Sequence, residues 1–277
     1  MKKILLNALL TCVSLSFAQS GAYAATKEHT AREKNKEHLR CIAKKLQAKY
    51  YNPDQYMLPK KCKLRRTLER LFSHPKVIQD NYWFTKAGFK TKFFRVRGSL
   101  RVASHPQLKG YLIKMFLESE AREKMWDRQR TLITRAGVAA ELRELIKKNK
   151  LRKIKVPKKY LFVLPPAAKT RIKTYVLVVQ DMKLVKMEKS KKAWKKIASK
   201  RVLRELYCVL NHGYASLAID QNIARTKNGK FACIDTEYPR RTFDLKRVER
   251  FFSRSNKLYW ESLIDHEKVH KDRGVNW

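Results

Sequence analysis

The chain has 277 residues, of which 65 are Lys or Arg and 24 are Asp or Glu, so its formal net charge is +41. It also contains 12 Tyr, 12 Phe and 5 Trp, and 44% of its residues are hydrophobic. Disordered basic tails are poor in aromatic residues, so the composition excludes such a tail and indicates a folded protein with a cationic surface. A positive charge of this size attracts polyanions, namely nucleic acid, anionic lipid or an acidic protein, without selecting among them.

The first 24 residues have the pattern of a secretory signal peptide. Lys2 and Lys3 precede an apolar stretch over residues 4–17, and Ala22 and Ala24 are the small residues that a signal peptidase reads. The stretch is short and interrupted by polar residues, although a retained membrane anchor is the alternative. We expect cleavage after Ala24 and an exported mature chain without a transmembrane segment. Its destination would be the periplasm, the medium or a host cell.

Four cysteines remain in the mature chain, and export permits disulfide bonds. Cys41 and Cys62 flank a compact basic segment and form one candidate pair, and Cys208 and Cys233 form another. Their spacing is not that of metal ligands. The alternative is that each cysteine is a small buried hydrophobic residue.

Residues 25–80 are predicted to form an N-terminal helical extension with a small core of its own. Apolar residues recur at three- and four-residue intervals over residues 28–49, which predicts a helix there. A second, shorter helix is predicted over residues 64–72.

Residues 81–182 are predicted to contain a sheet and one long helix. Short aromatic and aliphatic runs separated by Gly and Pro predict strands between residues 82 and 116. The long helix is expected over residues 118–148. Two further strands are expected over residues 160–164 and over the uncharged, β-branched run 175–179.

Residues 183–277 are predicted to be mainly helical. One basic helix is expected over residues 190–210, with Gly213 just after its end. A short strand over residues 230–234 and a closing helical region around residues 251–264 complete the chain. The order of elements predicts an α+β fold.

A hairpin pattern in the last third of the chain carries the candidate site. Asn222 precedes an apolar strand, the turn Asn228-Gly229, a second strand and then Asp235, 13 residues after Asn222. A hairpin that brings a carboxamide oxygen and a carboxylate together can hold Mg²⁺ beside a polyphosphate. The alternative is an Asn–Asp turn that caps an ordinary hairpin.

This pattern resembles that of the protein-kinase-like superfamily, which includes small-molecule kinases. The resemblance implies a two-lobed fold, with an N-terminal antiparallel sheet lobe and its long helix over residues 81–182, and a mainly helical lobe over residues 183–277. It also implies that Asn222 and Asp235 bind Mg²⁺, and that ATP binds between the lobes.

The resemblance extends to further positions that would contact the nucleotide. Lys114, at the end of a strand and before the long helix, would reach the phosphates. Glu141, with Glu144 as the alternative, would pair with this lysine. Gln180 and Met182 would belong to the hinge that meets the adenine ring.

The catalytic aspartate of the family has no counterpart in this sequence. In the motif H-R-D-L-x-x-x-N, counting back five residues from Asn222 reaches Leu217, and a second alignment places Tyr214 at the aspartate. Asp220 lies in a different turn of the loop, and a Gly-rich phosphate loop is absent from the sequence. No catalytic residue is therefore assigned, and we predict a pseudokinase-like protein that acts by binding or regulation.

Two other functions stay open at the level of sequence. The basic runs 60–66, 147–159 and 183–201 are first solvated faces and second polyanion-binding patches. They favour a secreted cationic binding or scaffold protein for nucleic acid or anionic surfaces, with no nucleotide site. The third alternative is an active atypical kinase that is delivered to a host cell. The expected partners are thus a nucleotide and a polyanion or acidic protein.

Overall fold

The computed structural model describes residues 52–93, 100–120, 125–165, 175–196, 198–214, 218–237 and 243–272. All of them belong to one compact unit, Tyr50–Trp277. The predicted signal peptide, the predicted helix over residues 28–49 and Cys41 lie outside the described residues. Within the described ranges, every helix is too short or too polar to cross a membrane.

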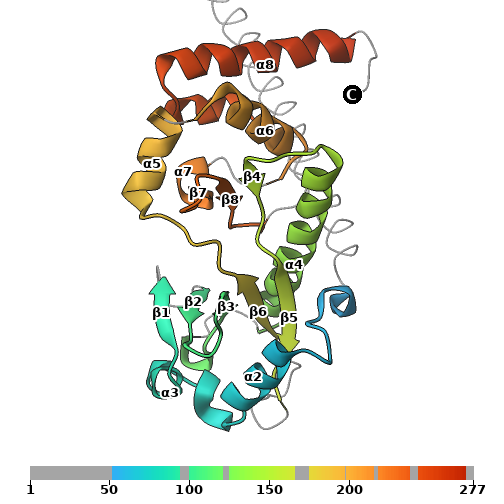
Figure 1. The fold of residues 1–277 in the computed structure, drawn as a ribbon. Helices are drawn as coiled ribbons and strands as arrows, with labels where there is room; N and C mark the ends of the chain where they lie inside the picture. Colours follow the sequence, from blue (N-terminus) through green and yellow to red (C-terminus); the bar gives the residue numbers. More distant parts are fainter. Residues whose placement is uncertain are drawn as a thin grey trace, which may run out of the picture. The chain divides into compact units, whose positions relative to one another are not determined.

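An antiparallel sheet of five strands forms the first half of the structure, and the order of its strands is β1-β2-β3-β6-β5 (Figure 1). The strands are β1 (Lys90–Phe93), β2 (Arg101–Ser104), β3 (Tyr111–Met115), β5 (Lys159–Val163) and β6 (Tyr175–Gln180). The predicted strands in this part of the chain are confirmed. The run that forms β6 is uncharged because its side chains are buried on both faces of the sheet.

One face of the sheet is covered by the segment that precedes it, which contains α2 (Lys63–Leu71) and α3 (Asn81–Lys86). Phe72, just after α2, is fully buried, and its ring centroid lies 5.3 Å from that of Phe89 and 6.1 Å from that of Phe162 on β5. The predicted short helix is confirmed. The expectation of a separate small core for this segment is wrong, because its apolar residues pack into the core of the sheet.

The other face of the sheet packs against the long helix α4 (Met125–Lys148) through Leu132, Ile133 and Ala136. The predicted helix is therefore confirmed from residue 125 onward. Helix α4 also contacts α6 and β4, so it reaches beyond the sheet to the elements that follow (Figure 1).

The second half of the structure combines four helices with a small sheet of order β4-β8-β7. These elements are α5 (Met187–Lys196), α6 (Lys200–Asn211), α7 (Ile219–Asn222), α8 (Arg254–Asp272), β4 (Ile154–Lys155), β7 (Ile223–Arg225) and β8 (Phe231–Cys233). Their core contains a chain of aromatic rings from Phe231 through Trp194 and Phe252 to Trp260, with successive centroids 4.1, 6.2 and 5.3 Å apart. Short 3-10 helices occupy Pro53–Tyr56, Pro75–Ile78, Glu118–Glu120 and Leu245–Phe251. The fold is thus α+β, as predicted.

Two local expectations are wrong, and each has a structural reason. The basic helix predicted over residues 190–210 is two helices, because Ser199 caps α6 by accepting a hydrogen bond from the backbone N–H of Val202. Cys233 is a buried free thiol, so it forms no bridge to Cys208. Cys62 is also a free thiol, and its Sγ accepts a hydrogen bond from the N–H of Arg65 at the start of α2.

We predict that Phe72→Ala lowers the free energy of unfolding by about 3–5 kcal/mol, because it leaves a cavity in the core that the sheet shares with α2. Urea denaturation followed by circular dichroism measures this change. Leu258→Ala is the control, since Leu258 is 63% exposed and should change stability by less than about 0.5 kcal/mol. Equal small effects for both variants would contradict the shared core.

Candidate functional site

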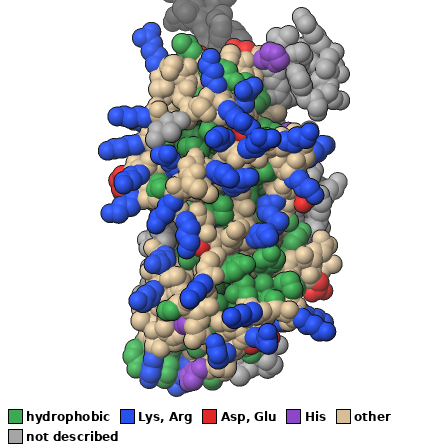
Figure 2. Space-filling model, in the orientation of Figure 1, with side chains coloured by type: hydrophobic (Ala, Val, Ile, Leu, Met, Phe, Trp, Pro, Cys, Tyr) green, Lys and Arg blue, Asp and Glu red, His purple; other side chains and the backbone are tan. Residues whose placement is uncertain are grey.

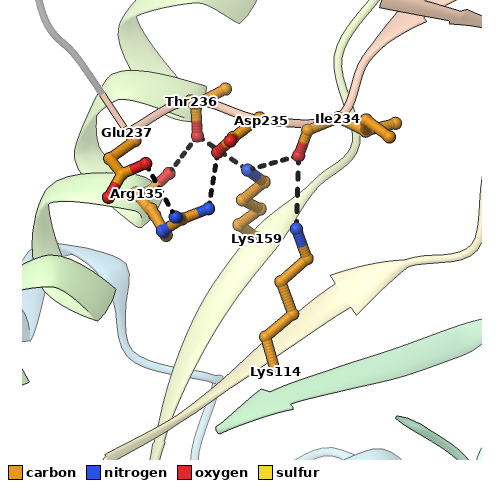
Figure 3. A network of polar contacts seen from close by, with 7 residues as sticks. All are labelled: Lys114, Arg135, Lys159, Ile234, Asp235, Thr236 and Glu237. Atoms are coloured by element: carbon orange, nitrogen blue, oxygen red, sulfur yellow. Dashed lines mark hydrogen bonds and ion pairs between the residues drawn. The ribbon is translucent and has the colours of Figure 1, made fainter. Parts of the chain in front are cut away.

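Three cationic side chains converge on the segment that follows β8 (Figure 3). We call Lys114, Arg135 and Lys159 the cation cluster. The ammonium group of Lys114 lies 3.5 Å from the carbonyl oxygen of Ile234. The ammonium group of Lys159 donates to the same carbonyl at 3.1 Å and to the hydroxyl of Thr236 at 2.7 Å.

The strand register explains why both lysines reach this segment. Lys114 on β3 lies opposite Leu177 on β6, and Leu177 lies opposite Leu161 on β5. Lys159 is two residues before Leu161, so it projects from the same face of the sheet. This is the face that α4 covers, and α4 supplies Arg135.

Arg135 binds two carboxylates that follow the hairpin and are separated by one residue. Its Nη1 lies 2.5 Å from Oδ1 of Asp235, and its Nη2 lies 3.0 Å from Oε2 of Glu237. Between them, the hydroxyl of Thr236 donates to the backbone oxygen of Arg135 at 2.7 Å. The guanidinium and the segment 235–237 therefore hold each other in one geometry, as expected for paired charge-assisted hydrogen bonds.

Burial and the excess of positive over negative groups in the cluster both perturb the two lysines. The pKa of Lys114 is lowered to about 8, first by burial and second by the charge of Arg135, while the charges of Asp235 and Glu237 oppose the shift. Burial also lowers the pKa of Lys159 well below its usual value, with the charges of Lys114 and Arg135 acting in the same direction. An anion bound here would relieve this repulsion, so the electrostatics favour an anionic ligand.

The hairpin that carries the predicted metal ligands is present. Strand β7 pairs with β8, and Gly229 at the turn has a φ of +80°, which favours glycine. The N–H of Ile234 donates to the carbonyl oxygen of Asn222 at 2.9 Å, so the backbone of Asn222 lies across from Ile234 and beside Asp235. Lys114, Asn222 and Asp235 thus belong to one region of the structure.

The donor set is nevertheless a poor fit for Mg²⁺. A carboxamide and a carboxylate have suitable oxygen atoms. However, the carboxylate of Asp235 is already bound by the guanidinium of Arg135, and Lys114 and Lys159 lie next to it. A divalent cation would have to displace Arg135 and would be repelled by both lysines. In this arrangement Arg135 supplies the positive charge that a metal ion would bring.

Glu141, the predicted partner of Lys114, contacts Tyr214 instead, the residue that one alignment sets at the position of the catalytic aspartate. Its Oε2 accepts a hydrogen bond from the hydroxyl of buried Tyr214 at 2.7 Å. The carboxylates whose charges stabilise protonated Lys114 are Asp235 and Glu237. Leu217, the other residue aligned with the catalytic aspartate, lies outside the described residues.

The predicted hinge residues are Gln180, the last residue of β6, and Met182, two positions later. The N–H of Gln180 donates to the carbonyl oxygen of Lys158 at 2.9 Å, and its side-chain oxygen accepts from the N–H of Lys158 at 3.2 Å. The backbone N–H of Gln180 therefore donates to the neighbouring chain segment and is not available to a ligand. Met182 is partly buried.

Sequence reasoning missed Arg135, Lys159 and Thr236. A signal for Lys159 existed, because it shares strand periodicity with the buried residue Leu161 and so points inward. Arg135 likewise follows buried Leu132 by one helical turn on α4. A basic residue at an inward position needs a polar partner. Its inward position therefore predicts a site better than its presence alone, because basic residues are common throughout this chain.

Comparison of the chain with protein-family models and with curated proteins finds no match.

We predict that Lys114→Met changes the pH dependence of stability. Because folding lowers the pKa of Lys114 from 10.5 to about 8, the unfolded chain binds more protons between these values. In the wild-type chain, the contribution of Lys114 to the free energy of unfolding therefore rises with pH between about 8 and 10.5 and is constant below that range. The stability of Lys114→Met relative to wild type should fall across this window by up to about 3 kcal/mol.

Urea denaturation at several pH values between 7 and 10 measures the difference. Lys109→Met, which removes the same charge from the exposed turn between β2 and β3, is the control and should give a difference that is independent of pH. Parallel curves for Lys114→Met and wild type would contradict the buried position of this ammonium group.

Proposed function

We propose that this chain is an exported pseudokinase-like protein that binds a nucleotide through the cation cluster, without a divalent ion and without phosphoryl transfer. The observation that carries the proposal is the 3.5 Å approach of Lys114 on β3 to Ile234, directly before Asp235 and 120 residues away in sequence. In kinases the lysine of the third strand and the aspartate after the second hairpin strand serve the same nucleotide. The long helix α4 follows β3 after a short 3-10 helix, and a long helix after the third strand is expected in the sheet lobe of a two-lobed kinase-like fold.

The departures from the kinase pattern support binding rather than catalysis. Kinases pair the strand lysine with a helix glutamate and place the aspartate on Mg²⁺. Here the long helix brings Arg135 to Asp235, and Tyr214, in one alignment, stands where an aspartate would orient the attacking hydroxyl. Export would be a further argument against catalysis, because ATP is scarce outside the cytoplasm unless the protein is delivered into another cell.

The polyphosphate of a nucleotide suits the charge of this site. Each lysine ammonium has three donors, and within the described part of the chain Lys114 makes one hydrogen bond, to the carbonyl of Ile234. The remaining donors can meet phosphate oxygens, and the negative charge would stabilise the protonated form of both lysines. Binding at pH 8 would consequently take up protons.

We predict that ATP binds at least as tightly in EDTA as in Mg²⁺, because Arg135 already supplies positive charge and free ATP carries more negative charge than its magnesium complex. Lys114→Met should weaken ATP binding by about tenfold or more, as expected for loss of a charge-assisted contact. Isothermal titration calorimetry of the mature chain measures the affinity, and Lys109→Met is the charge-matched control.

Asp235→Asn distinguishes the two ways of binding. A metal site would lose affinity when its carboxylate is removed, whereas a site of bare cations keeps or gains affinity, because one negative charge no longer faces the phosphates. Absence of binding in both buffers would reject the nucleotide site, and binding only with Mg²⁺ would reject its metal-free form.

We predict no phosphoryl transfer from ATP to the protein itself or to a general protein acceptor above the background measured with the heat-denatured protein. The physical reason is that Tyr214, which one alignment sets at the position of the catalytic aspartate, has a phenol and not a carboxylate to orient an acceptor hydroxyl. Incorporation of labelled phosphate measures the activity. Transfer that Lys114→Met abolishes would instead favour the active atypical kinase.

A second candidate function is that of a cationic binding or scaffold protein. Figure 2 shows Lys and Arg side chains spread over the whole visible face, with few carboxylates among them. Binding to an anionic polymer through such a surface falls steeply with salt concentration.

A further inference from the structure

A hollow of about 390 Å³ lies where α4 ends and β4 begins. Its lining consists of five basic and three aliphatic residues, namely Arg143, Lys147, Lys150, Arg152, Lys155, Ile146, Leu151 and Val156. None of the eight is acidic. Among the ion pairs of the described residues, none involves these five cations. Five uncompensated charges thus surround one small-molecule-sized space.

The turn that ends α4 places a lysine where glycine is favoured. The N–H of Leu151 donates to the oxygen of Ile146 at 2.9 Å, and the N–H of Lys150 donates to that of Lys147 at 3.1 Å. This pattern is a Schellman motif, whose left-handed position is most often glycine. Lys150 occupies it with a φ of +51°. Glycine at this position would therefore relieve backbone strain and at the same time remove a cation that lines the hollow.

The next turn of chain is held rigidly by a buried carboxylate from α6. Glu205 accepts hydrogen bonds from the backbone N–H groups of Arg152, Lys153 and Ile154 at 3.0, 2.6 and 2.9 Å. It also receives one from Nε of Arg201. Glu205 is thus engaged with the backbone and does not pair with the side chains that line the hollow. The basic residues are presented by a fixed backbone, which reduces the entropy lost on binding.

We propose that this hollow binds a compact ligand that carries several phosphate groups on a small carbon skeleton. Each phosphate monoester carries a charge of about −1.5 to −2 at neutral pH, so about three of them balance five cations. The aliphatic side chains of Ile146, Leu151 and Val156 offer an apolar surface for a ring or short chain. The site shares no residue with the cation cluster, so it does not depend on nucleotide binding.

The test uses inositol hexakisphosphate as the probe, with calorimetry on the mature chain in 150 mM salt. We expect one site, and Lys147→Ala and Lys150→Gly should each weaken binding by about fivefold or more. Lys150→Gly should do so while the thermal unfolding temperature stays equal or rises, because glycine relieves the backbone strain. This combination separates a lost contact from a damaged fold.

Lys148→Ala and Lys153→Ala are the matched controls, because each removes one exposed charge beside the hollow without lining it. They should change the affinity by less than about twofold. Equal losses for lining and control variants would overturn the proposal in favour of diffuse surface charge, and so would absence of binding. Lys114→Met should leave this binding unchanged, which separates the test from that of the nucleotide site.

Two sources could present the same chemistry, a soluble polyphosphate and a lipid headgroup. Vesicles of phosphatidylcholine with 5% phosphatidylinositol 4,5-bisphosphate form the second arm of the experiment. The lipid is identified as a source if the protein binds the vesicles, free inositol hexakisphosphate competes with this binding, and Lys150→Gly weakens it. A soluble ligand is identified if the protein binds the free probe and does not bind the vesicles. If a DNA duplex displaces the probe at equal phosphate concentration, the ligand is a nucleic acid and the proposal fails.

Discussion

The packing of buried cations against the segment after β8 is the interaction on which the structure depends. Lys114 and Lys159 come from the five-stranded sheet and Arg135 from the long helix, and all three find their described partners within residues 234–237. A buried charge without a partner would cost several kcal/mol. The sheet, α4 and the β7–β8 hairpin therefore keep fixed positions relative to one another, because only then do the buried cations have hydrogen-bond and charge partners.

The same network limits the chemistry of the site. Arg135 neutralises the carboxylate that a metal ion would need, and the hydroxyl of Tyr214 is engaged with Glu141. What remains is positive charge at low exposure, where electrostatic interactions are stronger than in water. Such a site is suited to holding an anion and lacks the arrangement that would activate a nucleophile.

The two proposed sites use positive charge in different ways. In the cation cluster, burial opposes protonation, as the lowered pKa of Lys114 records, so an anionic ligand would be coupled to proton uptake. In the hollow beside α4 the cations are more exposed, and selectivity would come from their convergence and from the backbone that Glu205 holds. The remaining surface charge is screened by salt and carries little selectivity.

The sequence by itself determined most of the secondary structure, because periodicity and turn residues act locally. The β-branched run of β6, the long helix and the glycine stop after α6 were all readable, whereas the break at Ser199 was hidden within a continuous basic pattern. The hairpin pattern also indicated Asn222 and Asp235, and the resemblance to the kinase-like superfamily indicated Lys114. Only the tertiary structure decided that Arg135 binds Asp235, since these residues are 100 positions apart and meet through strand register and helix packing. It also decided which of 65 basic residues are buried or convergent, because neither property is a function of local sequence.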